Sequence, residues 1–74
     1  MQIRNFEQKL DAIRRYRGSE NKQPARVTTA MMGSGYRVTL VIDGVAHMFS
    51  LTEKELPKVF AAFPGVTELW RLFD

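Results

Sequence analysis

The residues of this chain that could do chemistry are few, and the densest group is basic with one aromatic ring: Arg14, Arg15, Tyr16 and Arg17. Guanidinium groups bind phosphates and an interleaved ring stacks on a base, so the pattern is typical of a nucleic-acid contact. Arg26 would extend the same surface. A solvated helix end is the other interpretation, because Asp11 precedes the first two arginines by three and four residues and would pair with them. The sequence leaves both open.

Candidates for catalysis are scarcer still. The chain has no cysteine and a single histidine, His47, around which any Ser-His-Asp arrangement would have to be built. We expect His47 to be a half-buried residue of the sheet, since no carboxylates have the spacing of further metal ligands. Glu53 and Glu55 lie at a predicted helix start, where the helix dipole explains them. The sequence therefore predicts a protein that is not an enzyme, with no catalytic residues, metal or cofactor.

The segment Gly33-Ser34-Gly35 poses one more chemical question, because glycine-rich loops can cradle phosphates. A phosphate-binding loop needs a following Lys-Ser/Thr pair and a helix whose N–H groups converge on the anion. Here a strand pattern follows and no lysine is near. We predict a hairpin turn instead, with Ser34 and Gly35 as a two-residue loop.

Length and composition place these residues in one small domain, residues 1–74, with 45% hydrophobic residues and a net charge of +3. Residues 1–26 carry a net charge of +4, so the basic character belongs to one end. No apolar run approaches the roughly 18–20 residues that span a bilayer. The N-terminus also lacks the apolar segment of a secretion signal. We expect a soluble, cytoplasmic protein that does not contact a membrane.

The first element is a predicted helix over residues 5–17, because Ile3, Phe6, Leu10 and Ile13 recur at helical spacing. Asn5 would cap its start, and Gly18 would end it in a left-handed conformation. Residues 18–24 have no periodicity and form a predicted linker.

Over residues 26–51 the hydrophobic period changes to two, which predicts an antiparallel β-meander. Asp43-Gly44 lies between two alternating runs and is a strong signal for a type I′ hairpin. Its register sets Ile42 opposite Val45 and Val38 opposite Phe49, with Tyr36 opposite Leu51 and Leu40 opposite His47. With Ser34-Gly35 as the first turn, Met31 lies opposite Val38, Thr29 opposite Leu40 and Val27 opposite Ile42.

A second helix is predicted over residues 53–63, with Thr52 as N-cap and Glu55 closing a capping box. Pro57 either kinks this helix or moves its regular part to begin near Leu56. The C-terminal segment, residues 66–73, fits an edge strand or a short helix capped by Thr67, and we favour the strand.

Together these elements define an α+β fold: an N-terminal helix, a three-stranded antiparallel meander, a second helix on the same sheet face, and a short C-terminal strand or helix. The order of elements resembles that of double-stranded RNA-binding domains. Those domains carry lysines at the start of the second helix, whereas Thr52-Glu53-Lys54-Glu55 has no net positive charge here. The resemblance extends to the order of elements only, and no family is assigned from it.

The predicted outer face of the sheet is unusually apolar for a solvated surface. The predicted rows are Met32, Arg37 and Ser50; Ala30, Thr39 and Met48; Thr28, Val41 and Ala46. Methionine adapts to partners, and apolar centres with arginine nearby suit protein interfaces. Alternatively, the C-terminal segment folds over this face and makes it a second small core.

From these features we predict a small protein-binding module that occludes a partner's surface, as an accessory inhibitor or adaptor of the kind that phages also encode. The predicted binding residues are Met32, Arg37, Val41, Met48, Trp70 and Phe73. The expected partner is a protein with an acidic surface, and a homodimer through the same sheet is also considered. The runner-up is an RNA- or DNA-binding protein that uses Arg14, Arg15, Tyr16, Arg17 and Arg26.

Overall fold

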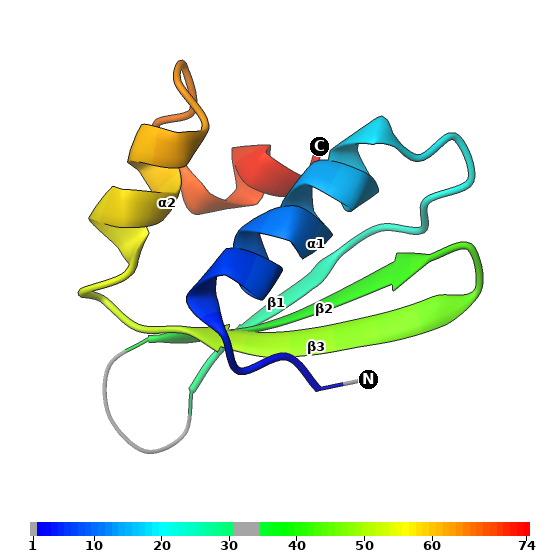
Figure 1. Ribbon diagram of the computed structural model, residues 1–74, viewed down its shortest axis with the longest axis horizontal. Helices are drawn as coiled ribbons and strands as arrows, with labels where there is room; N and C mark the ends of the chain where they lie inside the picture. Colours follow the sequence, from blue (N-terminus) through cyan, green and yellow to red (C-terminus); the bar gives the residue numbers. More distant parts are fainter. Residues whose placement is uncertain (1, 31–34) are drawn as a thin grey trace.

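The computed structural model describes residues 2–30 and 35–74, and it has the predicted α+β architecture (Figure 1). Helix α1 (Phe6–Gly18) begins where predicted, because the Asn5 side chain accepts hydrogen bonds from the backbone N–H groups of Glu7 and Gln8. The predicted left-handed Gly18 is wrong. Gly18 is the last helical residue, and the chain leaves the helix through Ser19 in an extended conformation.

The sheet has three antiparallel strands, β1 (Arg26–Thr29), β2 (Tyr36–Ile42) and β3 (Val45–Leu51), in the order β1-β2-β3. The second hairpin is confirmed in detail. Asp43 and Gly44 both have positive φ, at 51° and 80°, as a type I′ turn requires. The pairing of β2 with β3 follows the predicted register from Ile42 opposite Val45 to Tyr36 opposite Leu51.

The first hairpin has a different register from the predicted one. Val27 lies opposite Val38 rather than Ile42, and Thr29 lies opposite Tyr36 rather than Leu40. The pairing continues to Gly35, whose carbonyl accepts a hydrogen bond from the N–H of Ala30, so Ser34-Gly35 is not a two-residue loop. The register slips by an even number of residues, so every side chain stays on its predicted face. The predicted partner of Val38, Met31, lies outside the described residues.

The reason for the slip is the position of Gly35. Its φ is 128°, and a Cβ atom built on it would lie 2.8 Å from the carbonyl oxygen of Leu51. Glycine is therefore required here because the end of β3 passes close to its Cα, and Gly35 belongs to the ladder rather than to a two-residue turn.

Helix α2 (Leu56–Ala62) is shorter than the predicted helix over 53–63, and Pro57 has the second of the two predicted effects. The capping box still forms. Thr52 Oγ1 accepts from the N–H of Glu55, and Glu55 Oε1 accepts from the N–H of Thr52. Residues 53–55 form a turn, so the regular helix begins at Leu56.

The C-terminal segment is helical, and the favoured edge strand is wrong. A 3₁₀ helix, η1 (Leu69–Phe73), follows Glu68, with no side-chain cap from Thr67. Its buried and exposed side chains do not alternate as those of an edge strand would, because Leu69, Leu72 and Phe73 are all buried. A helical turn places all three toward one core, whereas a strand would expose one of them.

Two layers result, with α1, α2 and η1 all on one side of the sheet (Figure 1). The core lies between the layers, where the inner residues of β2 and β3 meet the apolar stripe of α1. Its fully enclosed side chains are Ile13, Tyr16, Val38, Leu40, Leu51, Val59 and Leu72.

The N-terminal residues cover part of one sheet edge. Gln2 forms a parallel bridge with Met48, and the N–H of Ile3 donates to the Met48 carbonyl at 2.8 Å. These residues run along β3 before the chain turns upward into α1 (Figure 1). Strand β1 therefore forms the opposite edge of the sheet.

Candidate functional site

No helix of the described residues covers the side of the sheet that faces away from α1, which we call the outer face (Figure 1). The observed registers arrange its side chains in three rows. The first row is Thr28, Arg37 and Ser50; the second is Arg26, Thr39 and Met48; the third is Val41 and Ala46. The alternative that the C-terminal segment covers this face is wrong, because η1 lies on the helical side of the sheet (Figure 1).

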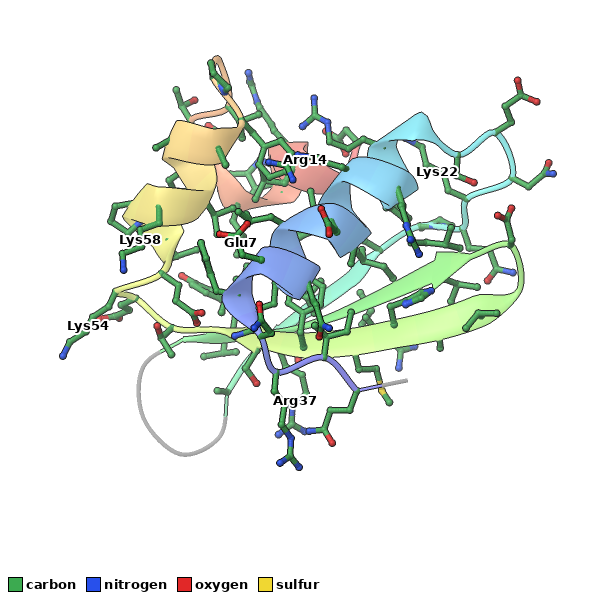
Figure 2. The ribbon with its side chains drawn as sticks, viewed as in Figure 1. Glu7, Arg14, Lys22, Arg37, Lys54 and Lys58 are labelled. Atoms are coloured by element: carbon green, nitrogen blue, oxygen red, sulfur yellow. The ribbon has the colours of Figure 1, made fainter. Side chains whose placement is uncertain are left out.

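Arginine stands in two of the three rows. Arg26 and Arg37 are both exposed, and Arg37 projects away from the helices (Figure 2). Met48 is 44% exposed and lies in the same row as Arg26. The three rows hold no carboxylate, so within the described sheet the outer face has a positive charge around an accessible apolar side chain. Such a surface suits an acidic partner.

A depression of about 500 Å³ adjoins this face at the edge of β3. Arg37, Met48 and Ser50 reach it from the outer face, and Arg4, which is exposed, reaches it from the N-terminal segment. Arg4 was not among the residues predicted from sequence. Its position follows from the parallel bridge of Gln2 to β3, which no periodicity signals.

The residues predicted to bind protein do not all share the outer face. Arg37, Val41 and Met48 lie on it, and Met32 lies outside the described residues. Trp70 is 63% exposed, but it belongs to the helical layer. Phe73 is only 6% exposed, so it is a core residue rather than a surface residue.

The basic run of α1 is also divided by the fold. Tyr16 is 2% exposed, its hydroxyl donates to the Gln23 carbonyl, and its ring meets that of Phe73 edge-on at 6.3 Å. A ring in that position cannot stack on a base, so its predicted role beside the arginines is wrong. In a sequence, a buried aromatic residue of a helix has the same spacing from neighbouring arginines as an exposed one. Only the tertiary packing distinguishes the two cases.

Arg14 and Arg17 lie together on one side of α1. The guanidinium carbon of each is 5.7 Å from the centroid of the Phe63 ring. Both therefore make cation–π contacts with the segment after α2. Arg14 also pairs with Asp11 at 3.2 Å, as the helical spacing predicts.

The other two basic residues of the predicted nucleic-acid surface lie elsewhere. Arg15 lines a depression on the opposite side of α1, next to His47 and Ile42. Arg26 is on the outer face. The structure thus separates Arg14 and Arg17, Arg15, and Arg26 into three places.

His47 is half-buried on the inner face, opposite Leu40, as the register predicts. It lines depressions shared with Arg15. Within the described part of the chain, no three His, Cys, Asp or Glu side chains form a group that could hold a metal ion.

An ion pair joins the two helices beside the sheet. Lys9 is 7% exposed, and its Nζ lies 3.1 and 3.2 Å from the two carboxylate oxygens of Glu55. Desolvation alone would raise the pKa of Glu55. The backbone hydrogen bond from Thr52 and the ammonium of Lys9 outweigh it and lower the pKa below its ordinary value. Glu55 therefore both completes the capping box and anchors α1 to the start of α2.

None of the helices in residues 2–30 and 35–74 is both long enough and apolar enough to cross a bilayer. Comparisons of this chain with models of protein families, with curated proteins and with solved structures gave no match.

Proposed function

We propose that this chain is a non-enzymatic protein-binding module and that it binds an acidic partner through the outer face of its sheet. One observation carries the proposal: the sheet face that none of the described helices covers presents Arg26 and Arg37 around the accessible side chain of Met48. Sheet faces that serve only to meet solvent carry mixed charges and hydroxyl groups. This face carries three hydroxyl groups as well, but its charges all have one sign and it exposes an adaptable apolar side chain.

The proposed mode of action is occlusion of the partner's surface, in the manner of an accessory inhibitor or adaptor, including those that phages encode. The depression beside β3 supports it, because Arg4 and Arg37 both line it and could take a carboxylate of the partner. Met48 would then pack against an apolar side chain next to that carboxylate. We place this activity in the cytoplasm.

Nucleic-acid binding is the competing proposal, but the surface that would bind a nucleic acid differs from the one predicted from the sequence. The helix α1 residues are separated from one another, and Tyr16 is enclosed. Phosphate groups could still meet Arg26 and Arg37, since guanidinium binds phosphate as well as carboxylate. The experiment must therefore separate the two ligand classes on the same face.

The test is capture of partners from a lysate of the organism that encodes the chain, with and without nuclease, using three forms of the protein. Arg37→Glu combined with Met48→Glu reverses the charge and polarity of the outer face. Arg14→Ala combined with Arg17→Ala is the control on α1, and it tests the basic residues that the competing proposal first used. We expect a partner that survives nuclease, is lost with the outer-face variant and is kept with the control.

A partner that nuclease removes would establish the competing proposal instead. Equal capture by the wild type and the outer-face variant would remove the outer face from the binding site. The melting temperature of the outer-face variant should stay close to that of the wild type, because Arg37 and Met48 are exposed. The control should melt at most a few degrees lower, because Arg14 and Arg17 lose exposed contacts with Phe63 and Asp11.

A further inference from the structure

The edge strand β1 has hydrogen-bonding groups that point away from the sheet. The N–H of Ala30 donates to the Gly35 carbonyl, which makes Ala30 and Gly35 a hydrogen-bonded pair. Hydrogen-bonded pairs alternate along an antiparallel ladder, so Arg26 and Thr28 also bond to β2. The backbone groups of Val27 and Thr29 therefore point outward, and no other described residue pairs with them.

An apolar depression of about 290 Å³ adjoins this edge on its inner side. Trp70, the single tryptophan of the chain, forms part of its wall and is 63% exposed. The lining residues are Pro24, Ala25, Val27, Trp70, Phe73 and Asp74. The side chain of any residue that pairs with Val27 would stand on the same face as Val27, beside this depression.

The two sides of the edge differ in chemistry. On the inner side the neighbour of a paired residue is the apolar depression, and on the outer side it is the guanidinium of Arg26. A strand added to β1 would alternate its side chains between the two. An acidic residue opposite Arg26 and an apolar residue opposite Val27 would satisfy both sides at once.

We propose that β1 binds an extended segment of the partner, in which acidic and apolar residues alternate, as an added strand of the sheet. This inference rests on the proposed function, since it names how an acidic partner would meet the sheet. The main-chain groups of Val27 and Thr29 would pair with the segment, Trp70 and Val27 would cover its apolar side chain, and Arg26 would pair with its carboxylate.

A second copy of this chain fits the edge less well. If two β1 strands paired about Thr28, Val27 would bond to Thr29 of the other copy, which satisfies the outward groups. Arg26 would then lie opposite Ala30 of the other copy, with no carboxylate to meet it. The charge of the outer face thus favours an acidic segment over self-association.

The test uses a short capped peptide that alternates glutamate and valine, and a matched peptide that alternates lysine and valine. Trp70 fluorescence reports directly on the depression, because no other tryptophan contributes. We expect the glutamate peptide to shift the emission of Trp70 to shorter wavelength and to slow hydrogen exchange at the N–H of Val27 and Thr29. The lysine peptide should bind about tenfold more weakly, because it opposes like charges.

Thr29→Pro removes an outward N–H and leaves the bonds to β2 in place, so the variant should fold and lose the peptide. Thr29→Val keeps the N–H and is the control that should retain binding. Equal binding by Thr29→Pro, no shift of Trp70 with the glutamate peptide, or equal binding of both peptides would overturn the inference.

A Trp70 shift that depends on protein concentration alone, with a dimer mass in sedimentation equilibrium, would assign the edge to a second copy and also overturn it. The inference can also fail while the proposed function stands. A lysate partner that Thr29→Pro still captures, but that the Arg37→Glu/Met48→Glu variant does not, would leave the outer face as the binding surface without the added strand.

Discussion

Replacing Gly35 by alanine should destabilise the fold more than any other change at a glycine of the described chain. The added Cβ would lie 2.8 Å from the Leu51 carbonyl oxygen, which belongs to the backbone and cannot rotate away. The φ of 128° adds a second cost, of about 1–3 kcal/mol, for a residue with a side chain. Relieving the contact requires movement of the strand end, which costs a similar amount. We expect a loss of about 2–6 kcal/mol.

Two other glycines separate these contributions. Gly44 has a φ of 80° and nothing within 4 Å of an added Cβ, so Gly44→Ala should cost only the backbone part, about 1–2 kcal/mol. Gly18 is helical and equally open, so Gly18→Ala should stabilise by about 0.4–1 kcal/mol. Gly18→Ala thus meets neither the positive φ nor the steric contact, Gly44→Ala meets the positive φ alone, and Gly35→Ala meets both.

Urea denaturation and thermal melting give the measurement. A chain of this length has a total stability of about 4–11 kcal/mol, so Gly35→Ala should lower the melting temperature by roughly 10 °C or more. A Gly35→Ala variant no less stable than Gly44→Ala would refute the reasoning. That result would mean that the end of β3 leaves room for a Cβ atom at Gly35, and it would also contradict the explanation of the register slip.

Three further outcomes follow from the ion pair and from the faces of the sheet. Lys9→Met should lower the free energy of unfolding by about 1–3 kcal/mol in urea denaturation, because it leaves the partly buried carboxylate of Glu55 without its cation. Asp11→Asn breaks an exposed ion pair and should cost less than about 0.5 kcal/mol. Folding lowers the pKa of Glu55, so the contribution of this carboxylate to stability is complete above the ordinary glutamate pKa and is lost as the pH falls through the lower folded value. Glu55→Gln should therefore flatten the loss of stability in acid. An unchanged profile of stability against pH would contradict this reasoning. Met48→Glu should change the free energy of unfolding by less than about 0.5 kcal/mol, whereas the adjacent Phe49→Ala should cost about 3–5 kcal/mol, and similar losses from both would mean that the faces are misassigned.

Local signals in the sequence predicted most of the fold. The Asn5 cap, the Asp43-Gly44 turn and the Thr52–Glu55 capping box each depend on residues no more than three apart, and each forms as predicted. Pro57 moved the start of α2 for the same local reason. Where the required contacts lie within one turn of chain, residue type is enough.

Apart from the left-handed end at Gly18, the wrong predictions depend on contacts between distant residues. The sequence predicts Gly35 in a turn because glycine is typical of hairpins, but the conformation of Gly35 depends on its contact with Leu51, sixteen positions along the chain. Tyr16 had the spacing of an exposed ring and is held inside by Gln23 and Phe73. The C-terminal segment alternates as a strand would, yet burial of Leu69 together with Leu72 and Phe73 selects a helical turn.

The slip of the first hairpin also changes what the candidate surface can bind. The predicted pairing of Val27 with Ile42 would have placed Arg26 at the end of the sheet, beyond the last row. The observed pairing places it opposite Thr39, in the same row as Met48. A rim arginine steers a partner and stays hydrated, whereas an arginine in the middle of an interface loses water on binding and needs a carboxylate opposite it. Under the proposed function, a partner that covers this whole row would remove water from Arg26 as well as from Met48, and an acidic group opposite Arg26 would then favour binding.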